Sequence, residues 1–223
     1  MRAWLGILVL MVACSGSSEP PPEKAGPPTL SSPKPVMPQA GAASETASSA
    51  DGFKFSLPDG SKGAILVSNS VIRVTGPVSL EGHRKENKRK YTSSGSVVAE
   101  IKYYDDGAFK LRRADGSGVW KVNRYTPEAG GARFKVKKAQ GGDNVEHMVV
   151  RPDGGGWRVD IDELKVGQVV RTDTGFEVRS KAGEVVLTAG GRLASGGLGL
   201  WLSPDVEAAH RPILLAELLA AGL

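Results

Sequence analysis

The chain has 223 residues, of which 40% are apolar and 24% are charged, and this composition excludes a protein that is disordered throughout. A single cysteine excludes an internal disulfide and a cysteine-based zinc site, and three histidines leave little room for a histidine-rich metal centre. The net charge of +5 is too small and too diffuse to indicate nucleic-acid binding. We therefore expect no metal, no cofactor and no nucleic-acid partner.

Residues 1–13 have the pattern of a secretory signal peptide. Arg2 supplies the positive charge, an apolar run follows, and Ala13 is the small residue expected before a cleavage site. As a helix the run over residues 3–13 would span about 16 Å, whereas a bilayer core needs about 30 Å. We expect a cleaved signal peptide rather than a membrane span.

The only cysteine follows this segment directly. Met11-Val12-Ala13-Cys14 resembles the lipobox of bacterial lipoproteins, although Met11 stands where leucine is usual. The resemblance implies that the thiol of Cys14 accepts a diacylglyceryl group before the signal peptide is removed. Two or three acyl chains anchor a protein firmly, because each buried methylene contributes about 0.8 kcal/mol. Ser15 stands where an aspartate would favour the inner membrane in that family, which implies the outer membrane. A secreted protein with a chance cysteine is the alternative.

Residues 15–50 have the composition of a spacer. They contain eight of the fourteen prolines and no aromatic residue, so they cannot bury enough surface to offset the entropy of ordering. A disordered coil of this length would average about 30–40 Å, and a fully extended one about 110 Å. The alternative is a segment that a proline-binding partner recognises. We divide the chain into a signal peptide (1–13), a lipidated cysteine with a linker (14–50) and a folded domain (51–223).

From residue 51 onward the pattern is that of an antiparallel β meander. Apolar residues alternate over short runs, and glycine interrupts them every eight to twelve residues. Asp-Gly pairs at 106–107, 115–116 and 153–154 suit tight hairpin turns. The predicted strands are 64–67, 71–75, 97–104, 108–113, 119–125, 133–138, 145–151, 157–161, 165–171, 176–180, 184–188 and 198–202.

A loose recurrence within this domain supports the same plan. Four segments share the order phenylalanine, charged residue, apolar residue and, five residues later, glycine. In a strand, the phenylalanine and the residue two positions on face the core, and the charged residue faces water. The segments begin at Phe53, Phe109, Phe134 and Phe176.

The C-terminal segment departs from the β pattern. Residues 212–223 are apolar nearly all round and include one charge, Glu217. A helix without a polar face is normally buried on all sides, so we expect the meander to wrap it and to bury Leu214, Leu215 and Leu218. Ser203 and Pro204 predict an earlier helix start, and Pro212 then predicts a kink or two short helices.

This architecture, mainly β with about twelve strands and a hydrophobic C-terminal helix, resembles the tubby C-terminal-like barrel, a plan similar to that of phospholipid scramblases and LURP-one proteins. Residues 176–187 resemble the strand-turn-strand unit of those proteins, and residues 198–223 resemble their closing strand and central helix. The resemblance implies a barrel and anionic-lipid binding. A β-sandwich or an open sheet capped by a helix is the competing fold.

Motifs for catalysis are lacking. The sequence has no G-x-S-x-G elbow, phosphate-binding loop, H-E-x-x-H motif or EF-hand loop. Asp160, Asp162 and Glu163 are clustered but lack the ligand spacing of a calcium site, so we expect a solvated turn.

The segment from residue 82 to 91 is the most basic in the chain. Near an anionic surface, each of its basic residues can contribute about 1 kcal/mol. They are candidates to bind anionic lipid, lipopolysaccharide or an acidic envelope partner, and a solvated hairpin tip is the alternative. These candidate ligand-binding residues are Arg84, Lys85, Lys88, Arg89 and Lys90.

These features together predict a membrane-anchored lipoprotein of the cell envelope. Acyl chains on Cys14 would hold it, and the β domain would be a non-enzymatic binding module. The alternative is an envelope hydrolase with a dispersed active site, which hydrolysis of generic esters, phosphates or glycans would reveal.

Overall fold

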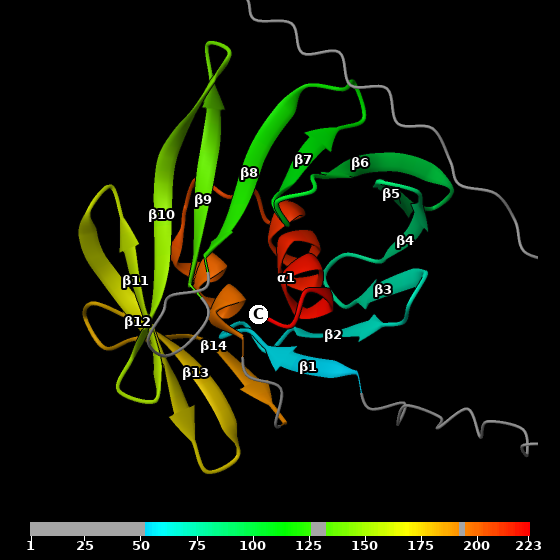
Figure 1. Cartoon of the computed structure of the whole chain (residues 1–223). Coiled ribbons are helices and arrows are strands. Elements are labelled where there is room, and N and C mark those ends of the chain that lie inside the picture. The colour runs from blue at the N-terminus through cyan, green and yellow to red at the C-terminus, as the bar shows by residue number, and fades with distance from the viewer. Residues whose placement is uncertain (1–51, 126–132, 192–194) are drawn as a thin grey trace, which may run out of the picture. The chain divides into compact units, whose positions relative to one another are not determined.

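The fold is a closed antiparallel β-barrel, seen in a computed structural model that describes residues 52–125, 133–191 and 195–223. Each strand pairs with its neighbours in the sequence, and β1 pairs with β14 to close the ring (Figure 1). The competing sandwich and open-sheet folds are therefore excluded. The predicted signal peptide, Cys14 and the linker up to residue 50 lie outside the described residues.

The fourteen described strands follow one another as an up-and-down meander. They are β1 (Phe53–Ser56), β2 (Lys62–Val67), β3 (Val71–Thr75), β4 (Leu80–Lys85), β5 (Lys88–Ser93), β6 (Ser96–Tyr103), β7 (Phe109–Arg113), β8 (Gly118–Tyr125), β9 (Arg133–Gln140), β10 (Asp143–Asp153), β11 (Gly156–Ile161), β12 (Leu164–Thr172), β13 (Gly175–Ser180) and β14 (Val185–Gly190).

Eleven of the twelve predicted strands are confirmed, and three further strands were missed. β1 has four residues and is absent from the predicted strands, although the recurrence marks Phe53; the missed β4 and β5 carry so many charges that little apolar alternation remains. The strand predicted over residues 198–202 is wrong, because the 3₁₀ helix η1 (Gly196–Leu202) lies there. Since η1 packs against several strands, Leu198 and Leu200 are buried by their surroundings, and their alternation does not indicate an extended chain.

Turn chemistry and side-chain alternation agree with the sequence. The glycines of the three predicted Asp-Gly turns, Gly107, Gly116 and Gly154, have φ of 77°, 83° and 54°, which favours glycine. The four recurrent phenylalanines and the residues two positions after them are all buried. The recurrence therefore marks strands whose apolar faces line the barrel interior.

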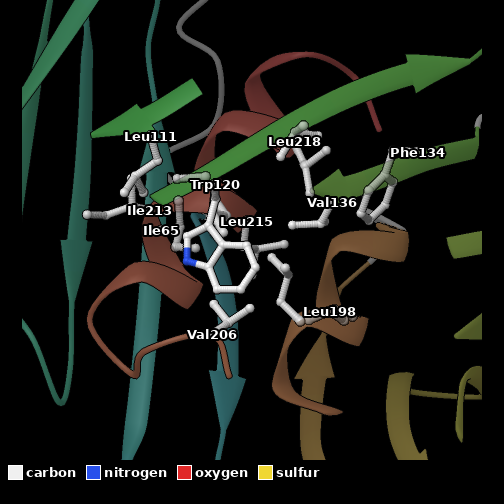
Figure 2. Packing of buried hydrophobic residues seen from close by; sticks show 14 of the residues in the cluster. Ile65, Leu111, Trp120, Phe134, Val136, Leu198, Val206, Ile213, Leu215 and Leu218 are labelled. Atoms are coloured by element: carbon white, nitrogen blue, oxygen red, sulfur yellow. The ribbon is translucent and has the colours of Figure 1, made fainter. Parts of the chain in front are cut away.

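The barrel interior is filled by η1 and by the single described α-helix, α1 (His210–Ala220) (Figure 1). Leu214, Leu215 and Leu218 are completely buried, which confirms the prediction for this helix. Figure 2 shows Leu215 and Leu218 packed near Trp120 and Leu198. The helix has no polar face because strands surround it.

The predicted start of the terminal helix is wrong. The residues from Ser203 to Ala209 are not helical, and α1 begins at His210. Pro212 is then the third residue of α1, a position where the backbone nitrogen has no partner within the helix, so proline fits without a kink. The predicted start at Ser203 is wrong because this residue ends η1 as its C-cap, with its backbone N–H bonded to the Leu200 carbonyl, and its buried hydroxyl lies beside His147.

Candidate functional site

Six lysines lie in one register row across strands β4 to β9. Their sequence neighbours Ile101, Leu111 and Val136 are buried in the barrel, so alternation places the lysines on the outside. Adjacent strands lie about 4.8 Å apart, which sets the spacing between successive positions in the row. We call these residues the lysine row: Lys85, Lys88, Lys102, Lys110, Lys121 and Lys137, each paired in register with the next.

The lysine row carries almost no compensating charge. Like charges directly opposite one another destabilise an antiparallel strand pair. Within the described residues, the one ion pair of the row joins Lys88 Nζ to Glu100 Oε1 at 3.2 Å. Beyond the last lysine the register continues to Glu146, which pairs with Lys135 outside the row. Interspersed acidic residues would keep this surface soluble at lower cost, so the arrangement points to an anionic partner.

Two tyrosines accompany the cationic surface. The ring of Tyr104 has its centre 5.4 Å from Lys102 Nζ and 5.3 Å from Lys121 Nζ. The ring of Tyr125 has its centre 5.7 Å from Lys135 Nζ. Tyrosine combines an apolar ring with a polar hydroxyl and is enriched at membrane–water interfaces, so this pairing suits a charged lipid surface.

The structure divides the five predicted basic residues between two faces of the β4–β5 hairpin. Lys85 and Lys88 belong to the lysine row, and Lys90 lies outward opposite His83. Arg84 and Arg89 are paired in register on the opposite face, where Arg89 is buried and Arg84 is exposed. The Arg84 guanidinium is 4.5 Å from the centre of the Tyr103 ring, and the Arg89 side chain is only 2% exposed. Strand alternation turns Arg89 inward, so this candidate ligand-binding residue is buried and does not lie on the surface with the other four.

Inside the barrel, Arg89 belongs to a buried network centred on Glu217 of α1. Tyr91 donates a hydrogen bond to Glu217 Oε1 at 2.7 Å, and Tyr103 donates one to Oε2 at 2.7 Å. Arg89 Nε lies 3.5 Å from Oε1 as an ion pair, and its Nε and Nη1 have no hydrogen-bond partner among the described residues. The network ties α1 to β5 and β6, and its members Arg89, Tyr91 and Glu217 are buried while Tyr103 is partly buried.

Burial governs the proton affinities of this network. It raises the pKa of Glu217 against the opposing effects of Arg89 and the two tyrosine hydroxyls. The pKa values of Tyr91 and Tyr103 are also raised well above the usual value. Burial is the larger cause, and the neighbouring Glu217 carboxylate is the second. Both hydroxyls therefore stay protonated and serve as donors. The sequence singles out Glu217 as the one charge in residues 212–223 but does not indicate its partners.

The predicted acidic turn is confirmed in part. Asp162 and Glu163 occupy a turn with φ of 46° and 67° and are exposed. Asp160, in contrast, is buried and pairs with Arg151 Nη2 at 2.9 Å and Arg158 Nε at 2.6 Å. An irregularity in the β11–β12 register at this residue accompanies the burial of two consecutive side chains, which strict alternation does not predict.

One further contact joins His147 and Ser203, which lie far apart in the sequence. His147 Nε2 lies 2.9 Å from Ser203 Oγ, and His147 Nδ1 lies 3.8 Å from Asp162 Oδ1. This order of hydroxyl, imidazole and carboxylate is that of a nucleophile, a base and an orienting group. Ser203, however, is completely buried, and it lines none of the four main pockets of the described residues.

Neither a metal site nor a membrane-spanning helix is found in the part of the chain that the structure describes. No group of three or more histidine, cysteine, aspartate and glutamate side chains there could hold a metal ion. In the same residues, no helix combines the length and the apolar character needed to cross a membrane.

Comparison with known proteins adds no family. The chain matches no protein-family model, and neither the curated proteins nor the solved structures include a significant match. The lipobox resemblance and the tubby-like resemblance therefore stay predictions.

Proposed function

We propose that this chain is a lipid-anchored protein of the cell envelope whose barrel is a non-enzymatic module that binds anionic lipid through the lysine row. Acyl chains on Cys14 form the anchor in this proposal, and Ser15 favours the outer membrane. The observation that carries the binding function is the register of the lysine row, which presents one sign of charge across six adjacent strands.

The physical argument is electrostatic. Each lysine near an anionic bilayer contributes about 1 kcal/mol, and the repulsion within the row is relieved when phosphates bind. A tether over residues 15–50 would hold the barrel at an average distance of about 30–40 Å from its anchor, which raises its effective concentration at that membrane. Membrane lipid is therefore favoured over a soluble acidic partner.

Vesicle binding tests the proposal. The chain from Ser15 onward, which lacks both the predicted signal peptide and the acylated Cys14, is incubated with vesicles of phosphatidylglycerol and phosphatidylcholine, or of phosphatidylcholine alone, and the bound fraction is measured by co-sedimentation. One variant replaces Lys102, Lys110, Lys121 and Lys137 with glutamine. We expect its affinity for anionic vesicles to fall by up to about 700-fold, because four lysines at about 1 kcal/mol each contribute about 4 kcal/mol.

A matched control removes the same charge from elsewhere on the barrel. It replaces Lys62, Lys165, Arg171 and Lys181, all exposed and outside the row, with glutamine. We expect this variant to lose much less affinity. Equal losses in the two variants would contradict a role for the row and indicate only a net-charge effect. Binding to a soluble polyphosphate but not to vesicles would replace lipid by an anionic polymer.

The anchor is tested separately. Mass spectrometry of the exported protein is expected to recover an N-terminal peptide that begins at an acylated Cys14. Recovery of an unmodified thiol on protein free in the culture medium would contradict the anchor without affecting the vesicle result.

The Ser203–His147 contact favours a second candidate, the envelope hydrolase. A buried hydroxyl without an adjacent pocket offers no access to a substrate, so we keep the binding module as our conclusion. Purified protein is expected to hydrolyse generic esters at background rates. Turnover that Ser203→Ala abolishes, while the melting temperature is unchanged, would establish the hydrolase.

A further inference from the structure

A pocket of about 430 Å³ opens at one end of the barrel, between the β1–β2 and β3–β4 turns and the beginning of α1. This volume lies within the range of small-molecule binding sites. The residues of its lining that matter here are Phe55, Val78, Val186, Trp201, Ala208 and Arg211. They come from β1, the β3–β4 turn, β14, η1, the segment before α1 and α1 itself.

The walls of this pocket are mainly apolar. The Trp201 and Phe55 rings contact each other with their centres 5.3 Å apart at an angle of 57°. Trp201, Val78 and Val186 are only partly buried, although they pack against the core. An apolar ligand that covered them would gain the free energy of removing this surface from water.

The one basic residue in the lining is held rigidly. Arg211 Nε donates a hydrogen bond to the Val206 carbonyl at 2.9 Å, and its Nη2 donates one to the Ser203 carbonyl at 2.9 Å. A guanidinium group has five N–H donors and no acceptor, so the Nη1 group is still available. Burial lowers the pKa of Arg211, and no carboxylate of the described residues forms an ion pair with it.

The one acidic residue in the lining does not neutralise this charge. Asp59 Oδ1 accepts hydrogen bonds from the Ser61 backbone N–H at 2.8 Å and from the Ser61 hydroxyl at 2.6 Å. Asp59 is exposed and is engaged within its own turn. The pocket therefore combines apolar walls with one fixed positive charge.

We propose that this pocket binds a single-chain amphiphile with an anionic headgroup, its alkyl chain against Trp201 and Val78 and its headgroup on Nη1 of Arg211. A carboxylate or a phosphate monoester would satisfy the same donor. Neutral alkyl chains lack the group that Arg211 recognises, so charge complementarity favours the anionic ligand. The site is distinct from the lysine row, which lies on β4 to β9.

Binding of defined probes tests this site. The chain from Ser15 onward, which lacks both the predicted signal peptide and the acylated Cys14, is titrated by calorimetry with dodecanoate, dodecyl phosphate and dodecanol below their aggregation concentrations. We expect dodecanoate or dodecyl phosphate to bind at least about tenfold more tightly than dodecanol, because a hydrogen bond to a charged group is stronger than one to a neutral group. Equal affinity for dodecanol would overturn the role of Arg211.

Substitutions at the rim locate the ligand. Ala208→Trp fills the pocket from an exposed position, and Ala209→Trp makes the same change one residue away, outside the lining. We expect Ala208→Trp to weaken dodecanoate binding more than about tenfold and Ala209→Trp to leave it within about twofold. Equal binding by the parent and Ala208→Trp would overturn the proposal.

Fluorescence supplies a second readout that does not depend on the rim variants. Ligand entry is expected to change the emission of Trp201, and Trp201→Phe is expected to remove that change. An unaltered change in Trp201→Phe would place the ligand elsewhere. Replacing Lys102, Lys110, Lys121 and Lys137 is expected to leave dodecanoate binding intact, so this proposal and the lipid-surface proposal can fail independently.

Discussion

The buried network around Glu217 provides the most demanding test of the barrel. Glu217→Gln keeps the size of the side chain but removes the negative charge that faces Arg89, whose side chain is 2% exposed. One tyrosine hydroxyl also loses a carboxylate oxygen, since Tyr91 and Tyr103 each use a different one. Breaking a buried ion pair from one side costs about 3–5 kcal/mol, because the remaining charge cannot be solvated. This is a large part of the stability of an ordinary domain.

Urea unfolding measures this loss. For a slope of about 2 kcal/mol per molar urea, the expected shift of the midpoint is about 1.5–2.5 M at constant slope. The double variant Arg89→Met, Glu217→Gln removes both charges. We therefore expect its loss of unfolding free energy to be about 2 kcal/mol smaller than the sum of the losses in the two single variants.

The control is an exposed ion pair in the same sheet. Arg73 Nη2 and Glu81 Oε1 are 3.5 Å apart, and their side chains are 62% and 40% exposed. Glu81→Gln should cost less than about 1 kcal/mol, since solvent screens the pair. If Glu217→Gln cost no more than Glu81→Gln, or if the Arg89 and Glu217 effects were additive, the network would not be what holds α1 to β5 and β6.

Three further predictions concern the same interior. Leu218→Asp places a charge at a completely buried position and should unfold the barrel at room temperature, which circular dichroism would show, and a melting point within a degree or so of the parent would refute the burial of α1. Gly82→Ala would bring a new Cβ to 2.6 Å from Tyr91 Cε1, so we expect it to lower the unfolding free energy by about 1–3 kcal/mol. The control Gly190→Ala, whose new Cβ would have no neighbouring atom within 4 Å, should lower it by no more than about 0.5 kcal/mol. Burial raises the pKa of Glu217 above its ordinary value of 4.5, so this carboxyl ionises in the unfolded chain at a lower pH than in the folded one. The unfolding free energy should therefore fall as the pH rises from about 4.5 to the pKa of Glu217 in the folded state. If the unfolding free energies of the parent and of Glu217→Gln changed equally with pH over this range, the raised pKa of Glu217 would be contradicted.

Local chemistry explains how much of the fold was predictable. Eleven strands, the Asp-Gly turns and the burial of the terminal helix follow from alternation, positive-φ positions and the lack of a polar face, all of which act between near neighbours in the chain. The misassigned segment Gly196–Leu202 shows where this reasoning ends. Inside a barrel every side of a segment is buried, so apolar alternation no longer distinguishes a strand from a 3₁₀ helix.

The candidate sites depended on contacts that sequence order does not reveal. The basic segment at residues 82–91 was visible, but the inward side chain of Arg89 was not, since its partner Glu217 lies 128 residues away. The lysine row is also invisible in the sequence, because its members are spread from Lys85 to Lys137 and only strand register aligns them. Composition and spacing thus determined the predicted export signal, the strands and the buried helix. Closure of the barrel decided which charges meet, because register and alternation fix the neighbours of each side chain across the sheet.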